Sequence, residues 1–325
     1  PLYNRGLTGD DSAEATMPDF VTIKVPATTA NLGPGFDSLG MALSMWNTMR
    51  VGWATKPTVK VHGAGADRLR LDNQNLMYRA ARRLLDESGT PSEHLSIESW
   101  QEIPLSRGLG SSSAAIVGGL FAANALSGYP VDPHGLLQLA TEIEGHPDNV
   151  APALMGGLSI VIAEDGTYQA APVPLPDDLQ VVAYIPDVPL ATKKAREVLE
   201  SQVARADAVF NIGRAALLVA SLALNRPEYL RAATQDRLHQ PQRQRVFRQM
   251  KVIFDHAMAA GARGVFLSGA GSSVVAFTTR GENRALTIGY EMADAGDKSG
   301  LTGTFRVLDP SPVGAALTDD IPDER

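Results

Sequence analysis

A loop rich in glycine and serine lies in the middle of the chain, and its residue types suit the binding of an anion. Residues 104–115 read PLSRGLGSSSAA, in which glycines let backbone N–H groups turn inward, serine hydroxyls follow, and an apolar helix begins at once. Free N–H groups and the positive end of a helix both attract phosphate. The loop lacks the lysine of a Walker A motif, the third glycine of a dinucleotide fingerprint and the Gly-x-Ser-x-Gly of a hydrolase. A tight turn capped by serine before a buried helix is the alternative interpretation.

Two glutamates lie on a second expected helix, His134–Glu144, and helical periodicity separates them. At ~100° per residue, Glu144 falls within the apolar stripe of that helix and Glu142 falls opposite it. A carboxylate on a buried stripe needs a basic group or a cation as its partner. We therefore interpret Glu142 as solvated and Glu144 as a candidate cation ligand, unless Glu144 is a charge at the surface end of the helix.

Further segments place polar residues and glycines between apolar runs. Residues 145–150 (GHPDNV) combine His, Asp and Asn in a turn, and these types are as typical of an ordinary turn as of a site. Residues 26–40 (PATTANLGPGFDSLG) directly follow a strand and suit either a simple omega loop or a substrate loop. Residues 268–273 (SGAGSS) predict a hairpin turn, or a second loop that closes over a phosphate.

The elements that must position these segments are a mixture of strands and helices. Alternating residues predict a strand over Phe20–Val25, which Pro26 is expected to end. Because strict βαβ alternation is missing, the predicted fold class is α+β rather than a doubly wound sheet. Further strands are expected over 95–100, 158–163, 180–185, 264–267 and 274–277, and helices over 75–85, 112–126, 134–144, 193–201, 208–224 and 245–260.

The length of the chain suggests its number of domains, and its charge excludes some classes of partner. A chain of 325 residues suggests two domains, and Pro172, Pro174 and Pro176 set the expected boundary near residue 171. With 29 Lys and Arg against 36 Asp and Glu, the net charge is −7. This balance predicts no nucleic-acid partner and no binding to an anionic membrane.

Cysteine content and apolar segments narrow the chemistry further. The chain has no cysteine, which excludes disulfides, thiol catalysis and Cys-ligated metals and is in keeping with a cytoplasmic location. The first residues lack the apolar segment of a secretory signal, and the runs Ala114–Ala123 and Ala215–Leu224 are shorter than the ~20 residues of a membrane helix. Residues 1–17 and 318–325 are expected to be polar tails.

Taken in order, these segments resemble the motifs of the GHMP kinases, and among them those of the branch that phosphorylates L-homoserine. The matching segments read PATTANLGPGFDSLGMAL, PLSRGLGSSSAA, EGHPDNVAPALMGG and GARGVFLSGAGSSVVAF, and the resemblance covers residues 18–315. The first and third segments point to that branch, whereas the two Gly/Ser loops define only the superfamily. The resemblance implies an α+β, two-domain GHMP kinase fold, with a ribosomal-protein-S5-like domain over 18–170 and a ferredoxin-like domain over 171–317.

The resemblance also implies ATP and Mg²⁺ as cofactors. Mg²⁺ would bind Ser112 and Glu144, in agreement with the helical phase of Glu144. The ATP phosphates would rest on the backbone amides of residues 108–113, with Asn75 near the adenine. The ATP-binding residues implied in full are Pro104, Leu105, Ser106, Arg107, Gly108, Leu109, Gly110, Ser111, Ser112, Ser113, Ala114 and Asn75.

The implied reaction converts L-homoserine to O-phospho-L-homoserine, a step of threonine biosynthesis, in a cytoplasmic homodimer. The implied substrate-binding residues are Asn31, Asp37, His146, Asn149, Arg196 and Arg243. A zwitterion with a primary alcohol needs a carboxylate for its ammonium and guanidinium groups for its carboxylate. Phosphoryl transfer needs mainly positioning and charge neutralisation, so we expect catalytic roles for Asn149, Asp37, Ser112 and Glu144 but no dedicated general base.

Other functions remain open at this level. A GHMP kinase for a mevalonate-like alcohol would not need the charges of Asp37 and the two arginines, and a regulatory nucleotide-binding protein without catalysis would not need a metal carboxylate. A serine hydrolase is disfavoured because no nucleophile elbow is present. One departure from the family pattern follows residues 240–243 (QPQR): the chain continues as QRVFRQMKVIF where many relatives have an apolar-Pro-Gly turn. The departure concerns the substrate wall beside Arg243.

Overall fold

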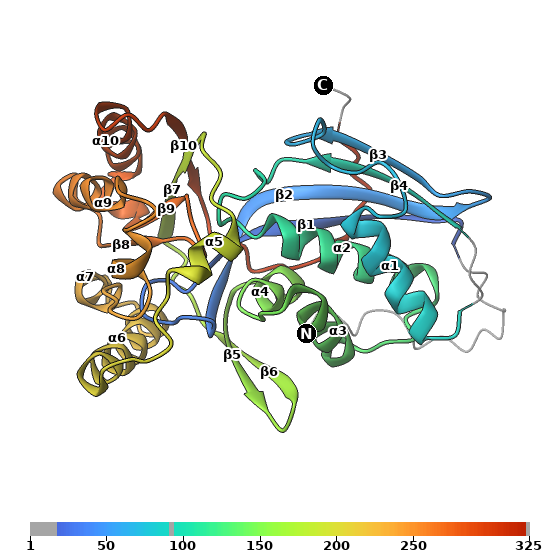
Figure 1. Ribbon diagram of the computed structural model, residues 1–325, viewed down its shortest axis with the longest axis horizontal. Helices are drawn as coiled ribbons and strands as arrows, with labels where there is room; N and C mark the ends of the chain where they lie inside the picture. Colours follow the sequence, from blue (N-terminus) through green and yellow to red (C-terminus); the bar gives the residue numbers. More distant parts are fainter. Residues whose placement is uncertain (1–17, 91–93, 323–325) are drawn as a thin grey trace.

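Two β-sheets organise the part of the chain that the structure describes, residues 18–90 and 94–322 of a computed structural model (Figure 1). The first sheet has the strand order β11-β1-β2-β4-β3, and the hairpin β5-β6 joins it at β2. The second is a four-stranded antiparallel sheet with the order β10-β7-β9-β8. Strands and helices mix along the chain, which confirms the expected α+β class.

Helices lie together on one face of the first sheet (Figure 1). Among them α2 packs against β1 and against α1, α3 and α4, so it is surrounded and can be apolar on every side. The strands are β1 (Phe20–Ala30), β2 (Leu39–Ala54), β3 (Thr58–Gly63), β4 (His94–Gln101), β5 (Leu158–Glu164), β6 (Thr167–Val173) and β11 (Ala316–Leu317), and the helices are α1 (Leu76–Glu87), α2 (Ser111–Leu126), α3 (Pro133–Glu144) and α4 (Val150–Met155).

The second sheet has the chain order βαββαβ, and numbering its strands along the chain gives the spatial order 4-1-3-2. This is the expected ferredoxin-like arrangement. Its strands are β7 (Leu179–Pro186), β8 (Gly264–Leu267), β9 (Val274–Thr279) and β10 (Gly303–Leu308). The other elements of this part are α5 (Thr192–Glu197), α6 (Arg205–Ala223), η1 (Pro227–Tyr229), α7 (Leu230–Ala233), α8 (Gln240–Arg243), α9 (Met250–Ala259), η2 (Arg280–Glu282) and α10 (Ala285–Lys298).

The first strands differ from the sequence expectation. Strand β1 does not end at Pro26 but continues to Ala30. The pairing of β1 with β2 shifts register between Pro26 and Ala27, and such an irregularity accommodates a residue without a backbone N–H. Strand β2, which the sequence analysis did not predict, has 16 residues that are nearly all shielded from solvent, so it lacks the alternation by which a half-exposed strand is recognised.

Some helices are shorter than expected. The helix predicted over 193–201 ends early, because α5 covers only Thr192–Glu197. The helix predicted over 245–260 begins late, at Met250. The residues before Met250 form turns, in which the N–H groups of Val246 and Met250 bond to carbonyls three residues back. Periodicity over short apolar stretches does not distinguish such consecutive turns from a helix.

The boundary between the two parts differs from the expected position near residue 171. Strand β6 crosses that position, and its last residue, Val173, pairs with Leu158 of β5. The end of the chain also returns to the first sheet, where Pro310 bridges Leu43 and β11 pairs with β1. The N–H of Thr318, in the expected acidic tail, bonds to β1 as well. The expected tail over 1–17 lies outside the described residues.

The two parts of the chain share buried apolar side chains. One core cluster runs from Ile23 and Leu84 around the first sheet to Val181 and Phe277 in the second sheet. A second cluster fills the space between the second sheet and helices α9 and α10. Because one core spans both sheets, the loops that meet between them are held by packing on both sides.

Helix α6 qualifies as a membrane-spanning candidate by length and composition, and it is the one such helix within the described residues. Its most apolar window has a mean hydropathy of 1.4 and is 22% buried. A single helix of this kind is weak evidence, because helices of soluble proteins pass the same criterion. The sequence analysis considered only the run Ala215–Leu224 of this helix and found it too short to span a membrane.

The contact between α1 and α2 gives a test of the packing. Gly119 of α2 faces the backbone of α1, and a Cβ at this position would overlap the carbonyl of Met77. We expect Gly119→Ala to lower the free energy of unfolding by about 1–3 kcal/mol, because the helices must separate. Urea denaturation measures this. Gly213→Ala on α6 is the matched control: its Cβ would meet no atom within 4 Å, so it should be neutral or stabilising. Equal effects of both substitutions would contradict this packing.

Candidate functional site

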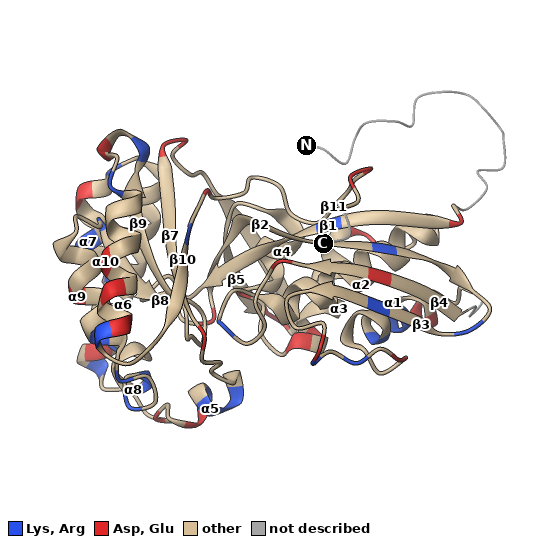
Figure 2. Cartoon of the chain, turned by 90° about the horizontal axis from the view of Figure 1, so that it is seen from above, with Lys and Arg blue, Asp and Glu red and all other residues tan. Residues whose placement is uncertain are grey.

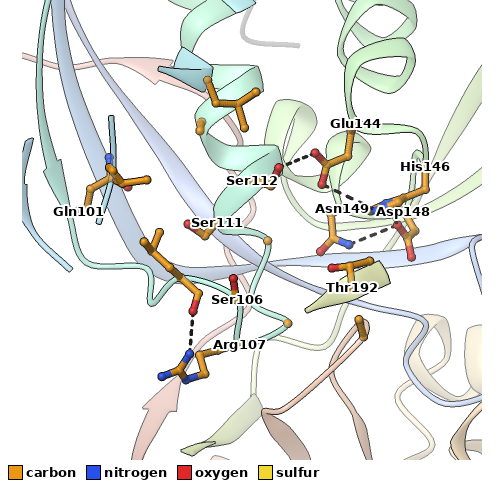
Figure 3. A pocket seen from close by; sticks show the side chains of 18 of the residues that line it. Gln101, Ser106, Arg107, Ser111, Ser112, Glu144, His146, Asp148, Asn149 and Thr192 are labelled. Atoms are coloured by element: carbon orange, nitrogen blue, oxygen red, sulfur yellow. Dashed lines mark hydrogen bonds and ion pairs between the residues drawn. The ribbon is translucent and has the colours of Figure 1, made fainter. Parts of the chain in front are cut away.

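A cavity of about 420 Å³ lies between the two parts of the chain, and segments from both line it. The first part contributes the loop at 105–110, the start of α2, the segment 68–77 and residues 144–149. The second part contributes α5, α8 and the β8–β9 loop. In Figure 3 the side chains of Ser112, Glu144, His146 and Asn149 point toward one another from different elements.

The loop before α2 borders the cavity, and within the described residues the N–H groups at the start of the helix have no hydrogen-bond acceptor. Helix α2 begins after Gly110, which has φ 71° and offers no side-chain cap, so the first N–H groups of the helix have no intrahelical or side-chain acceptor. A Cβ on Gly110 would overlap the hydroxyl of Thr28, and a Cβ on Gly108 would overlap the carbonyl of Ser268. This arrangement could bind an anion, which is the role that the sequence analysis predicted for the loop.

The hairpin loop 268–273 packs against the phosphate-type loop, which is the loop at 105–110. It joins β8 to β9, as expected for a hairpin. Its Ser268 hydroxyl donates to the carbonyl of Gly108 (2.6 Å), and the N–H of Ser273 donates to the carbonyl of Arg107 (2.9 Å). The Arg107 guanidinium donates to the carbonyls of Leu105, Pro186 and Asp187, so it ties the loop to the end of β7. The loop conformation therefore depends on both parts of the chain.

Not all of the expected ATP-binding residues line the cavity. Leu105, Ser106, Arg107, Gly108, Gly110, Ser111, Ser112 and Asn75 do, whereas Pro104, Leu109, Ser113 and Ala114 do not. Leu109 and Ala114 are buried in the core below the loop. The side chain of Asn75 caps α1, because it accepts from the N–H of Met77 and donates to the carbonyl of Arg70. Sequence reasoning missed Leu69, Met77 and Gln101, which line the same end of the cavity and carry no motif.

Glu144 lies on the shielded side of α3, as its helical phase predicted, and faces the start of α2. Its carboxylate accepts hydrogen bonds from the hydroxyls of Ser112 (2.7 Å) and Ser113 (2.9 Å), and its side chain is 10% exposed. Glu142 lies on the opposite side, where it is exposed and pairs with Arg83. A carboxylate and hydroxyls are hard oxygen donors, which suit Mg²⁺. The donor set at Ser112 and Glu144 therefore fits the implied ion.

The turn after α3 holds His146, Asp148 and Asn149 in one hydrogen-bonded group. His146 Nδ1 lies 3.0 Å from Asp148 Oδ1, and the hydroxyl of Thr28 donates to Asn149 Oδ1 (2.8 Å). The Thr28 bond fixes the orientation of the Asn149 amide, whose NH₂ group donates one hydrogen bond to Asp148 Oδ1 (3.3 Å) and has a second N–H to donate. Burial lowers the pKa of His146, but the Asp148 hydrogen bond and the charges of Asp148 and Glu144 outweigh it and raise the pKa above its ordinary value. The sequence analysis did not select Asp148 or Thr28.

Asp37 and Arg196, which lie far apart in the sequence, form a two-point ion pair. The Arg196 Nη atoms lie 2.9 and 2.7 Å from the two Asp37 oxygens, and this pair raises the pKa of Arg196. Asn31 lies beside them, donates to the carbonyl of Gly269 and accepts from the N–H of Asp37. The cavity thus holds a carboxylate and a guanidinium in contact, with an amide that positions the carboxylate.

Arg243 lines the cavity although its side chain is otherwise buried. Its Nε donates to the carbonyl of Ala195 (3.2 Å), which joins α8 to α5. Figure 2 shows these two helices side by side, each with basic residues. Burial and the neighbouring charge of Arg196 lower the pKa of Arg243 to about 10, so it remains a cation at neutral pH. Arg243, which the sequence analysis selected from this basic segment, therefore does line the cavity.

His239, which sequence reasoning did not select, is fully buried beside Arg243. Burial lowers its pKa to about 4 despite the nearby carboxylate of Asp236. That carboxylate already accepts the N–H groups of residues 238–240 and the amide of Asn211. Asp236 Oδ2 lies 3.5 Å from His239 Nε2, but the loss of solvation on burial outweighs its charge, so the ring is neutral at pH 7.

The chain resembles known proteins over most of its length. Residues 75–157 match the family model of the GHMP kinases N terminal domain, and residues 218–296 match that of GHMP kinases C terminal. The homoserine kinase of Moorella thermoacetica is 42% identical over 296 residues, which cover 91% of this chain and 99% of that protein. The homoserine kinase of Picosynechococcus sp. is 40% identical, with 91% and 99% covered.

Solved structures agree with these relatives. A crystal structure of homoserine kinase from Cytophaga hutchinsonii is 30% identical, has a TM-score of 0.85, and the match covers 95% of this chain and 100% of that one. A mevalonate kinase from L. major shares the fold at 15% identity, with a TM-score of 0.64 and 88% and 95% covered.

The neutral state of His239 predicts a pH dependence of stability. In the unfolded chain a histidine has a pKa of about 6.5, whereas the folded value is about 4. Below pH 6.5 the unfolded state takes up a proton that the folded state does not, so the free energy of unfolding falls as the pH decreases toward 4. The loss is about 3 kcal/mol at most. Urea denaturation at pH values from 7.5 to 5 measures this change. The fall in the free energy of unfolding that is due to His239 should be missing in His239→Gln and retained in His256→Gln. If the free energies of His239→Gln and the unsubstituted protein differ by the same amount at every pH, the prediction is wrong.

Proposed function

The chain belongs to the GHMP kinases and, within them, to the homoserine kinases, and we infer that it catalyses the ATP-dependent phosphorylation of L-homoserine to O-phospho-L-homoserine. This is a step of threonine biosynthesis. One observation carries the inference beyond the family likeness. The cavity that contains the phosphate-type loop also contains Asp37, Arg196 and Arg243, the charges that an amino-acid zwitterion requires.

We propose that the Asp37–Arg196 pair receives the zwitterion. The ammonium and carboxylate of an amino acid are attached to the same carbon, so a carboxylate and a guanidinium already in contact offer matching charges at matching spacing. The Phe36 ring contacts both arginines: its centroid lies 5.4 Å from Cζ of Arg243 and 5.5 Å from Cζ of Arg196. Arg243 thus adds a second guanidinium for the substrate carboxylate. Asn31 and His146 complete the proposed substrate site.

The nucleotide and metal assignments rest on the other end of the cavity. ATP would place its phosphates on the free N–H groups of the loop at 108–113, and Ser112 and Glu144 would hold Mg²⁺. When bound, the ion supplies positive charge that neutralises the phosphates. Local positive potential from backbone amides and a helix end is sufficient to attract ATP to a chain whose net charge is −7.

The residues around the substrate hydroxyl act by orientation. Thr28 fixes the orientation of the Asn149 amide and Asp148 accepts one of its two N–H groups, so the second N–H would donate to an oxygen of the substrate or of the phosphate. Asp37 is engaged by Arg196 and, in the complex, by the substrate ammonium, so we assign no general base. Alignment of the hydroxyl behind the γ-phosphorus would then provide most of the rate enhancement.

An ADP-coupled assay with Mg-ATP and L-homoserine, mevalonate or galactose tests the proposed activity. We expect turnover with L-homoserine and little with the other two, because neither of them carries an ammonium group for Asp37. Turnover of mevalonate alone would favour the alternative GHMP kinase function. ATP binding without turnover on any alcohol would favour a regulatory protein.

The metal assignment predicts different effects for the two glutamates of α3. Glu144→Gln replaces a charged oxygen ligand by a neutral one, so the Mg²⁺ concentration for half-maximal activity should rise about tenfold or more. Glu142→Gln is the matched control on the same helix, exposed and paired with Arg83, and should change it little. Magnesium titrations at saturating ATP measure both variants. Equal shifts would refute the assignment of Glu144.

The substrate assignment predicts an affinity effect at Asp37. Asp37→Asn keeps the shape but removes the charge that pairs with the ammonium, so the KM for L-homoserine should rise about tenfold or more while kcat changes less. Asp177→Asn, an exposed aspartate between β6 and β7, is the control and should leave both constants unchanged. Steady-state kinetics decide the role: a loss of kcat at an unchanged KM would make Asp37 the general base.

We also propose a cytoplasmic homodimer without nucleic-acid or membrane partners. Apolar side chains on α6 support a protein interface, since Val209 and Ile212 are 62% and 68% exposed beside an apolar groove. Light scattering after size exclusion would give the mass, and Ile212→Glu should shift a dimer toward the monomer. An unshifted mass would place the interface elsewhere. Cell fractionation would test the location.

A further inference from the structure

His239 is held between two parts of the proposed substrate site. Its Nε2 lies 2.7 Å from the carbonyl oxygen of Gly33, in the loop that carries Asp37, and its Nδ1 lies 3.0 Å from Nη1 of Arg243. The ring stacks on Phe36, with 5.3 Å between centroids, and it is 0% exposed. His239 therefore contacts the loop, the aromatic ring and the arginine.

The hydrogen-bond partners of His239 determine its protonation state. A guanidinium has only donors, so Nδ1 must accept from Arg243, and a carbonyl has only acceptors, so Nε2 must carry the proton that is donated to Gly33. Both bonds exist together only in the neutral Nε2–H tautomer. A protonated ring would place an N–H of His239 against an N–H of Arg243.

The Arg243 guanidinium is thereby restrained on one side. Its Nε bonds to Ala195 of α5, and its Nη1 bonds to both His239 and Gly269. Within the described residues, no hydrogen bond to a protein acceptor is recorded for Nη2. The three partners come from α5, from the residue before α8 and from the β8–β9 loop, so the guanidinium has little freedom to rotate away from the cavity that it lines.

We propose that His239 is a positioning residue, which orients Arg243 through Nδ1 so that the guanidinium meets the substrate carboxylate. This inference rests on the proposed function, in which Arg243 binds that carboxylate. The bond to Gly33 serves a different purpose, since it connects the ring to the loop of Asp37. His239 thus links the group that recognises the carboxylate to the loop that recognises the ammonium.

Two substitutions separate these bonds. The amide of His239→Asn reaches the place of Nδ1 and can accept from Arg243, whereas the amide of His239→Gln reaches the place of Nε2 and can donate to Gly33. We expect His239→Gln to raise the KM for L-homoserine about tenfold, the usual effect of losing a hydrogen bond to a charged group. The KM for ATP should stay within about threefold in both variants, and His239→Asn should keep the homoserine KM closer to its original value.

A substrate without the carboxylate gives a readout that a merely structural role would not change. For 3-aminopropan-1-ol, which lacks only the carboxylate of homoserine, His239→Gln should not alter kcat/KM beyond about twofold. In an Arg243→Met background the same substitution should add little to the homoserine KM, because it acts through the missing guanidinium. His256→Gln, on the exposed part of α9, controls for the substitution itself.

The outcomes distinguish the carboxylate site from the positioning role of His239. If Arg243→Met leaves the homoserine KM unchanged, the proposed carboxylate site is wrong. If Arg243→Met raises it but the Asn and Gln variants of His239 have equal effects, or weaken ATP equally, the positioning role is wrong and the carboxylate site stands. Nitrogen NMR of the unsubstituted protein needs no folded variant: the Nε2–H tautomer of His239 at pH 7 is expected, and an imidazolium or the Nδ1–H tautomer would overturn the proposal.

Discussion

The close packing of the loop before α2 against the β8–β9 loop and strand β1 is the constraint on which the rest of this site depends. Gly108 and Gly110 lie so near Ser268 and Thr28 that a side chain at either position would overlap them. This contact holds the loop before α2 in a shape that leaves the first N–H groups of the helix without acceptors. An anion site made of backbone amides needs this rigidity, because flexible amides would turn to solvent or to each other.

The contact depends on the core that the two parts of the chain share. The hairpin loop 268–273 belongs to the second sheet, yet it supports a loop that belongs to the first, and Arg107 makes the reciprocal connection to the end of β7. If the two sheets moved independently, the phosphate-type loop would lose its support. The apolar cluster that runs from Ile23 to Phe277 prevents such motion.

The cavity has two ends that differ in their polar groups. Ser112 and Glu144 form an oxygen-rich end beside the free amides, and Asp37, Arg196 and Arg243 form an end of alternating charge. His239 belongs to the second end although it is neutral, because a neutral ring can accept from a cation where a second cation would repel it. The neutrality of one buried ring therefore bears on both the stability and the recognition proposed for this protein.

Residue types and their local period were enough to predict much of the site. The glycine and serine pattern predicted the anion loop, and helical phase separated Glu144 from Glu142, because both signals depend only on neighbours in the chain. Family likeness, rather than period, directed attention to Asp37, Arg196 and Arg243. No local signal predicted β2, because a strand shielded on nearly all sides has no alternation to read.

The sequence by itself determined the anion loop, the phase of α3 and the α+β class, since each follows from spacing over a few residues. Only the tertiary structure decided that Pro310 and β11 complete the first sheet and that Asp37 meets Arg196. It alone decided that His239 lies between Gly33 and Arg243, with a pKa lowered by burial. The physical reason is the same in each case: pairing between distant segments, and the desolvation that goes with it, depends on which surfaces pack together and not on the order of residues along either segment.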